Sequence, residues 1–173
     1  MGPTTDLRRE LKRTFVPFMT ARGFVLDNRH APQFQNYRRT VGDRVQLLEI
    51  QWEKYGSPRF CVNLGQVGIQ GVLCWGEVVA AQDAAPSHAT ESARLYPRGN
   101  GSSTRHWFRQ DRPLLSALWH GSRRVPPEVP VRQLMDLFEE AEAYWRTGEA
   151  GPHLRVSDHS WAVSAPCQDA YDP

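Results

Sequence analysis

Two stretches of the chain carry apolar residues at the three- and four-residue spacing of an amphipathic helix. The first follows a capping threonine at residue 4 or 5 and ends at Gly23, which suits the left-handed conformation that stops a helix. Pro17 predicts a bend or a split near Thr14, because proline lacks an amide donor. The second stretch, residues 131–147, follows three prolines and ends at Gly148. The apolar positions are Leu7, Leu11, Phe15 and Phe18, then Val131, Leu134, Leu137, Phe138, Ala141 and Trp145.

Between these helices, apolar and polar residues alternate with the two-residue period of β-strands. Residues 33–40, 44–53 and 60–64 follow this pattern, and short glycine-containing turns join them, which predicts an antiparallel meander. The first of these runs has the composition of a half-buried edge strand. Residues 67–80 are apolar but interrupted by glycines, which favours a bulged or bent strand. Shorter elements are predicted as strands at 92–96 and 105–109 and a helix at 113–119.

This order of elements predicts an α+β fold, a single twisted and mainly antiparallel sheet with an N-terminal and a C-terminal helix packed on one face. The length of 173 residues fits one domain. We place that domain at residues 1–150 and expect residues 151–173 to form a polar tail in which one short segment packs. The strand residues expected to lie under both helices are Leu48, Ile50, Phe60 and Val62.

The sequence also predicts the compartment. No apolar run reaches the roughly 18–20 residues of a membrane helix, and the first ten residues lack the apolar core of a signal peptide. Cys61, Cys74 and Cys167 form no closely spaced pairs with one another or with histidines, which argues against structural zinc and against a disulfide framework. We expect a cytoplasmic protein with no membrane association and no cofactor.

Charge is unevenly distributed along a chain whose formal net charge is +2. Residues 1–60 have a net charge of +5 and residues 131–173 a net charge of −5. Of the 21 basic residues only two are lysine. Arginine binds carboxylate and phosphate through a planar fork, but a GC-rich coding sequence produces the same arginine excess.

The densest basic stretch, residues 94–124, interleaves arginines with aromatic residues. Arginines bind carboxylates and phosphates in bidentate pairs, so this stretch predicts a surface for a small anionic ligand or an acidic protein partner. The alternative is structural, with the aromatic residues in the core and the arginines paired with the acids of residues 131–149. The nearly neutral chain argues against nucleic acid. The candidate binding residues of the stretch are Arg94, Arg105, Trp107 and Arg109.

Familiar catalytic and nucleotide-binding motifs are missing from the sequence, including the phosphate-binding loop, the dinucleotide fingerprint and the nucleophile elbow. The glycine-rich run at residues 99–102 lacks a following lysine and predicts a solvated loop. A nucleophile–base pair formed by Cys61 or Ser102 with His106 stays an open alternative. The acidic run Glu139, Glu140 and Glu142 is typical of a solvated helix face.

Short motifs succeed one another over residues 11–65. They are Arg22-Gly23-Phe24 at a helix end, Tyr37-Arg38, Ile50-Gln51-Trp52 and Val62-Asn63-Leu64-Gly65. In this order they resemble the bacterial family named domain of unknown function 4304, with looser matches at Arg94-Leu95 and Trp107. The resemblance implies an α+β fold and a bacterial origin, and the family name assigns no activity. Residues 66–92 and the tail after residue 148 depart from the family pattern.

The matched polar residues Arg38, Gln51 and Asn63 are expected to share the sheet face opposite the helices. Together with Arg94 they suit a carboxylate or a peptide segment, and the alternative is a purely structural role at a strand end. Two functions follow. One is a non-catalytic binding protein, for example a partner-neutralising immunity-like protein that uses its arginine and aromatic surface. The other is an enzyme or a small anionic-ligand binder that uses these four residues.

Overall fold

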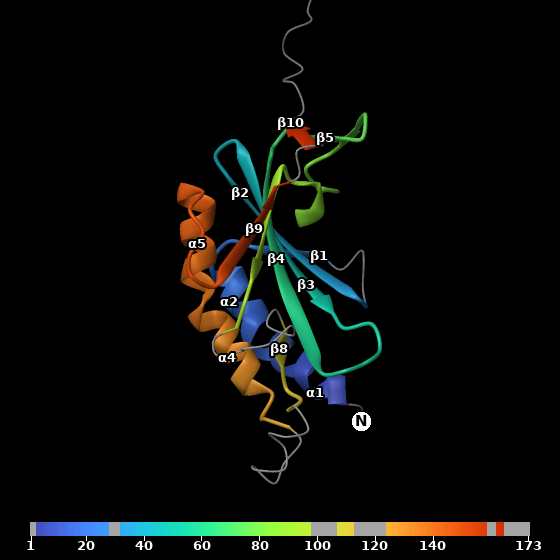
Figure 1. The fold of residues 1–173 in the computed structure, drawn as a ribbon, viewed down its shortest axis with the longest axis vertical. Coiled ribbons are helices and arrows are strands. Elements are labelled where there is room, and N and C mark those ends of the chain that lie inside the picture. The colour runs from blue at the N-terminus through green and yellow to red at the C-terminus, as the bar shows by residue number, and fades with distance from the viewer. Residues whose placement is uncertain (1–2, 28–31, 98–106, 113–123, 159–161, 165–173) are drawn as a thin grey trace, which may run out of the picture.

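Seven strands form one antiparallel sheet, and two helical segments cover one of its faces (Figure 1). The computed structural model describes residues 3–27, 32–97, 107–112, 124–158 and 162–164. The strand order is β1-β2-β3-β4-β7-β9, and β8 also pairs with β4. This arrangement confirms the predicted α+β fold. The strands are β1 (Val25–Asp27), β2 (Phe34–Val41), β3 (Arg44–Trp52), β4 (Arg59–Gly68), β7 (Glu91–Leu95), β8 (Phe108–Arg109) and β9 (Leu154–Asp158).

The N-terminal helix is interrupted, as its proline predicts. Helix α1 (Pro3–Glu10) passes into a π-helical turn, η1 (Leu11–Phe15), and then into α2 (Val16–Ala21). The wider turn lies immediately before Pro17, whose ring and missing amide are incompatible with the regular hydrogen-bond ladder. Gly23 follows at φ +80°, which confirms the predicted helix stop.

The C-terminal helix differs from its prediction at both its start and its middle. It consists of α4 (Glu128–Asp136) and α5 (Phe138–Thr147), separated at Leu137, and Gly148 ends it at φ +76°. Pro130 was expected to precede the helix but lies in its first turn, where amides have no intrahelical acceptor, so the missing donor does no harm. Among the described residues, no helix combines the length and apolar character needed to cross a membrane.

Both helical segments pack on the same sheet face, as their apolar stripes predict. Phe138 lies at the centre of this core, with ring centroids 5.2 to 6.4 Å from Phe15, Phe18, Phe24 and Trp145. The fully buried strand residues of this core include Leu48, Ile50, Phe60, Val62 and Leu64.

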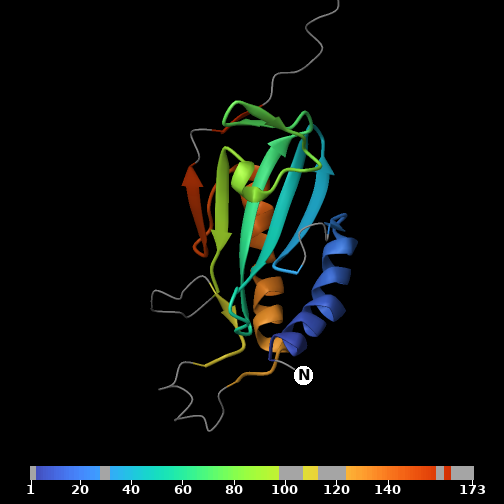
Figure 2. The same cartoon turned by 90° about the vertical axis from the view of Figure 1, so that its right-hand side faces the viewer.

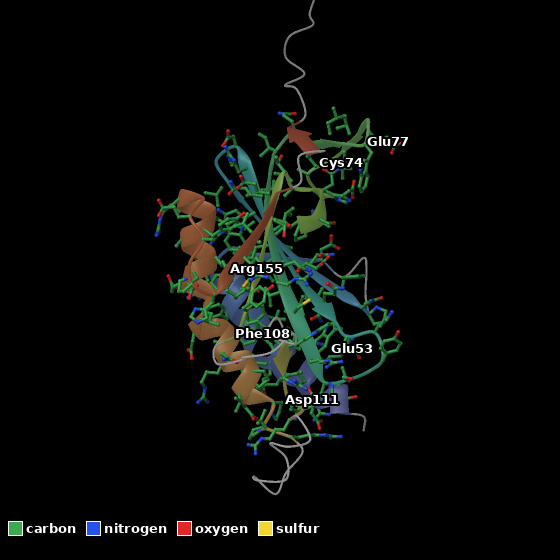
Figure 3. All side chains as sticks on the ribbon, viewed as in Figure 1. Glu53, Cys74, Glu77, Phe108, Asp111 and Arg155 are labelled. Carbon is green, nitrogen blue, oxygen red and sulfur yellow. The ribbon has the colours of Figure 1, made fainter. Side chains whose placement is uncertain are left out.

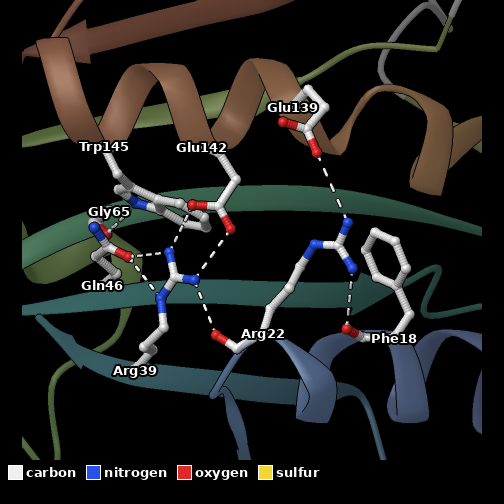
Figure 4. Close-up of polar contacts among 8 residues, drawn as sticks. All are labelled: Phe18, Arg22, Arg39, Gln46, Gly65, Glu139, Glu142 and Trp145. Atoms are coloured by element: carbon white, nitrogen blue, oxygen red, sulfur yellow. Dashed lines mark hydrogen bonds and ion pairs between the residues drawn. The ribbon is translucent and has the colours of Figure 1, made fainter.

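A half-buried arginine connects the helices to the sheet (Figure 4). Arg39 on β2 binds the carboxylate of Glu142 on α5 at 2.6 and 3.1 Å, and the side-chain oxygen of Gln46 on β3 at 2.6 and 3.0 Å. It also donates to the carbonyl of Arg22 at the end of α2, at 2.9 Å. These bonds use all five N–H donors of the guanidinium, so Arg39 is saturated by the protein itself.

The acidic run on α5 is only partly solvated, which corrects its prediction. Glu142 binds Arg39, and Glu140 accepts hydrogen bonds at 2.6 Å from the ring and at 2.9 Å from the backbone amide of His153. Only Glu139 matches the expectation, since its side chain is 79% exposed and its oxygen lies 3.7 Å from Arg22. Helical spacing places these carboxylates on the helix surface, but the segments that reach that surface come from elsewhere in the chain.

Residues 67–80 form a second, smaller sheet in place of the single bulged strand that was predicted. β4 continues to Gly68, and after a turn β5 (Val72–Cys74) and β6 (Glu77–Val79) form a hairpin. β10 (Ala162–Ser164) completes this sheet in the order β10-β5-β6. A second core lies between this sheet, the segment after it and the main sheet; it contains Val45, Leu47, Val67, Val72, Cys74, Ala81, Ala84 and Ala89.

The polar tail contributes an outer strand to the main sheet. β9 pairs antiparallel with β7 along five residues, from Leu154 opposite Leu95 to Asp158 opposite Glu91. The sheet thus extends past residue 150. Two segments of the tail pair with strands, β9 with β7 and β10 with β5, where one short packed segment was expected. The predicted helix at residues 113–119 lies outside the described residues, as do Arg105, His106 and Ser102.

Candidate functional site

The described residues cover only part of the main-sheet face opposite the helices. Figure 2 looks onto this face, with α5 behind the strands and the short turn η2 (Pro86–His88) in front of them. Because side chains alternate between faces and the strands pair in register, one row of side chains crosses five strands at the same height. From β2 to β9 this row contains Asn36, Glu49, Asn63, Arg94 and Arg155.

A cavity of about 520 Å³ lies over this row, and we refer to it as the open-face cleft. The cleft is lined by the last four residues of the row, by Phe34 and Gln51 on one side and by Tyr96 on another. Ser92 and Ser157 line it at the neighbouring height, and η2 contributes a wall through Pro86 and Ser87. Its size is that of a small-ligand site. Figure 3 shows the side chains of this region, with Arg155 labelled on β9.

Gly65 determines how close the wall comes to the floor of the cleft. A Cβ atom at this position would lie 2.9 Å from the Cα of Pro86 and 3.1 Å from the Cβ of Ala89. Real Cβ atoms essentially never make such contacts, so η2 reaches the sheet only because residue 65 has no side chain. This explains the glycine that ends the Val-Asn-Leu-Gly motif.

Asn63 stands at the centre of the polar network in the cleft. Its oxygen accepts a hydrogen bond from Arg94 Nε at 2.8 Å, and its Nδ2 donates to Glu49 at 2.8 Å and to Gln51 Oε1 at 3.3 Å. The amide therefore separates the arginine from the carboxylate. Arg94 is held through Nε, and its two terminal nitrogens make no hydrogen bond within the described part of the chain. This is the opposite of Arg39, which has no donor left.

Cys61 lies beside this network and is a poor nucleophile. Its thiol is buried and approaches Gln51 Oε1 at 3.4 Å. Burial raises the pKa of the thiol to about 11, and the positive charge of Arg94 opposes this only in part. The protonated thiol is the form present at neutral pH, and the thiolate is the reactive form.

The structure brings together three of the four predicted site residues. Gln51, Asn63 and Arg94 all line the cleft, while Arg38 does not. Arg38 lies on the same face, but its guanidinium binds the carboxylate of Asp27 at 3.0 Å and the carbonyl of Ala81 at 3.0 Å. It also donates to the carbonyl of Gln82. Arg38 therefore anchors the segment over the second core.

Of the basic and aromatic stretch, the described residues Arg94 and Arg109 do not cluster around Trp107. Arg109 pairs with Asp111 at 2.7 Å, and the ring of Trp107 lies 5.3 Å from the guanidinium of Arg59. Arg94 is opposite Asn63 on β4 whereas Arg109 is opposite Arg59, which puts them about 13 Å apart along the strand. The acid that pairs with Arg109 is thus local, and not one of those in residues 131–149.

A larger cavity of about 940 Å³ lies at the end of α5, on the helix side of the sheet. Arg39, Gln46 and Glu142 line it, but they satisfy one another. These three polar side chains therefore have a structural role, and the open-face cleft is the stronger candidate site.

Sequence reasoning missed Arg155, Ser157 and Glu49. The first two enter the cleft through the pairing of β9 with β7, which joins segments about sixty residues apart without a local turn. The available signal was the pair of segments Ser92-Ala93-Arg94 and Arg155-Val156-Ser157, which have the same pattern in opposite directions. Within the described ranges, no group of three or more His, Cys, Asp or Glu side chains is placed to hold a metal ion.

Comparison of this chain with protein-family models, with curated protein sequences and with solved structures gave no match. The resemblance proposed from the sequence therefore stays a prediction.

Proposed function

We propose that this protein is a non-catalytic binding protein whose open-face cleft receives the anionic group of a small ligand. The observation that carries the proposal is the state of Arg94. Arg94 lines a cleft of about 520 Å³; its Nε is fixed by Asn63 at 2.8 Å, and its other two guanidinium nitrogens make no hydrogen bond to the described residues. A guanidinium positioned in this way is preorganised for a bidentate contact with an oxyanion, because little side-chain freedom remains to be lost.

Two features favour binding over catalysis. The buried thiol of Cys61 has a pKa near 11, so it is protonated at neutral pH. The groups at the centre of the cleft, Asn63 and Gln51, are amides, which neither ionise nor supply a nucleophile. A bacterial origin and a cytoplasmic location belong to the same proposal and rest on the sequence.

The proposal is tested by isothermal titration calorimetry with acetate, succinate, glutamate and inorganic phosphate at constant ionic strength. At least one anion is expected to bind saturably, and Arg94→Gln is expected to weaken its binding tenfold or more. Arg132→Gln, which removes an exposed arginine on the helix side, is the matched control and should leave binding unchanged. Equal binding by both variants, or no saturable binding of any anion, would refute the proposal.

A second candidate, the partner-neutralising protein, is favoured by a different observation. Trp75 is 75% exposed at the tip of the β5–β6 hairpin and has a φ of 49°, a left-handed conformation that residues other than glycine rarely adopt. Val78, on β6 of the same hairpin, is 60% exposed. Exposed tryptophans are frequent anchors of protein interfaces. If a protein retained from the native host loses its affinity for Trp75→Ala and keeps it for Arg94→Gln, this second function is supported.

A further inference from the structure

Two arginines stand directly opposite each other on neighbouring strands of the cleft. Arg94 on β7 is the register partner of Arg155 on β9, and both line the cavity. Like charges at directly opposite positions destabilise a sheet. No carboxylate among the described residues forms an ion pair with either guanidinium, and Arg155 makes one aromatic contact, with the ring of Tyr96 at 5.7 Å. The fold thus holds two positive charges together at a solvent-accessible site.

Two hydroxyl groups stand beside the arginine pair. Ser92 is the register partner of Ser157, and the alternation of side chains places this pair on the same face as the arginines, one step along the strands. Both serines line the cleft as well. A Ser-x-Arg segment on β7 and an Arg-x-Ser segment on β9 therefore pair in antiparallel register, and all four side chains line the cleft.

The number of hydrogen-bond donors decides which anion fits the part of the cleft between β7 and β9. The four terminal nitrogens of the two guanidiniums carry about eight N–H groups, and the hydroxyl of Ser157 adds an O–H group. A carboxylate accepts about four hydrogen bonds through two oxygens. A phosphate monoester presents three terminal oxygens and carries a charge of about −2 at neutral pH, which matches two arginines.

We propose that the arginine pair and its two serines form a site for a phosphate monoester of a small molecule. This inference rests on the proposed function and specifies its ligand. Glu49, a carboxylate that accepts a hydrogen bond from Asn63, lies at the β3 end of the row, two strands away from Arg94. The phosphate therefore sits between β7 and β9, and the organic part of the ligand extends over Gln51 toward Phe34.

Titration with phenyl phosphate and benzoate tests the inference, because these probes share an aromatic ring and differ in the anionic group. At pH 7.5 and constant ionic strength, phenyl phosphate is expected to bind at least tenfold more tightly than benzoate. A short peptide containing phosphoserine serves as a third probe. Weaker binding of the peptide assigns the site to a small molecule, and tenfold tighter binding assigns the phosphate to a protein partner and overturns the small-molecule source.

Arg155→Gln separates a phosphate site from a structural arginine. It should weaken phenyl phosphate binding tenfold or more and, in buffer free of multivalent anions, raise the melting temperature by about 1–3 °C because the like-charge contact is gone. Ser157→Ala should weaken binding severalfold, and Arg132→Gln should not change it. If benzoate binds as tightly as phenyl phosphate, the phosphate assignment fails and the proposed anion-binding function stands. If neither probe binds and no other anion binds, the phosphate assignment and the proposed anion-binding function both fail.

Discussion

Gly65→Ala is predicted to move the wall of the open-face cleft. The new methyl group would meet two backbone atoms of Pro86, Cα at 2.9 Å and the carbonyl oxygen at 3.2 Å, and the Cβ of Ala89 at 3.1 Å. Neither the backbone nor a buried alanine can rotate away, so the segment 86–89 must shift as a unit. Overpacking of this kind destabilises by about 1–3 kcal/mol, and the lower entropy of the unfolded chain returns about 0.4–1 kcal/mol.

The net expectation is a loss of about 0.5–2 kcal/mol in the free energy of unfolding, measured by urea titration. Gly68→Ala is the matched control on the same strand, because its Cβ would have the carbonyl oxygen of Gly71 at 3.8 Å as its nearest neighbour. Amide chemical shifts should change at residues 86–89 in Gly65→Ala alone. A Gly65→Ala protein as stable as the Gly68→Ala protein would refute the role assigned to residue 65.

Three further predictions concern ion pairs, a thiol and the polarity of the cleft. Glu142→Ala leaves two nitrogens of the half-buried Arg39 without their carboxylate acceptor and should cost about 1–3 kcal/mol in a urea titration. Glu139→Ala, at a side chain that is 79% exposed, should cost under about 0.5 kcal/mol, and equal losses would contradict the network. Burial raises the pKa of the Cys61 thiol to about 11. The stability that the buried thiol contributes is therefore complete below the pKa of the thiol in the unfolded chain, and it declines as the pH rises from about 9 to 11. Alkylation by iodoacetamide, followed by mass spectrometry, should be slow at pH 8, and rapid labelling would contradict this. Glu49→Gln should strengthen anion binding two- to threefold in calorimetry, and weaker binding would place a cationic group of the ligand over Glu49.

The sequence predicted the elements whose residues make regular patterns. Alternation in residues 44–53 and 60–64 predicted correctly which side chains face the helices and, by difference, that Gln51 and Asn63 lie on the opposite face. Pro17 and Gly23 predicted correctly where the first helix is interrupted and where it ends. These features depend on neighbours within one turn or one strand, which is the range over which periodicity carries information.

The remaining features depend on partners that periodicity does not reveal. Arg39 meets Glu142 across 103 residues, and nothing local distinguishes that carboxylate from a solvated one. Arg38 has the strand position of a site residue, but the irregular segment at residues 81–82 folds over it and takes its hydrogen bonds. Arg155 joins the cleft only because a strand beyond the last helix returns to the sheet edge. The positive charge on the β9 side of the cleft comes from the arginine that this strand contributes.

The most direct test of the account is the NMR spectrum of the arginine Nε–Hε groups during a titration with phenyl phosphate. The protein contains its own controls, since Arg39 is saturated by internal bonds and Arg38 is held by Asp27 and backbone carbonyls. The account predicts that the signals of Arg94 and Arg155 shift together and saturate with one dissociation constant, while those of Arg38 and Arg39 stay in place. A shift of Arg39 without Arg94, or saturation in which no arginine signal moves, would contradict it.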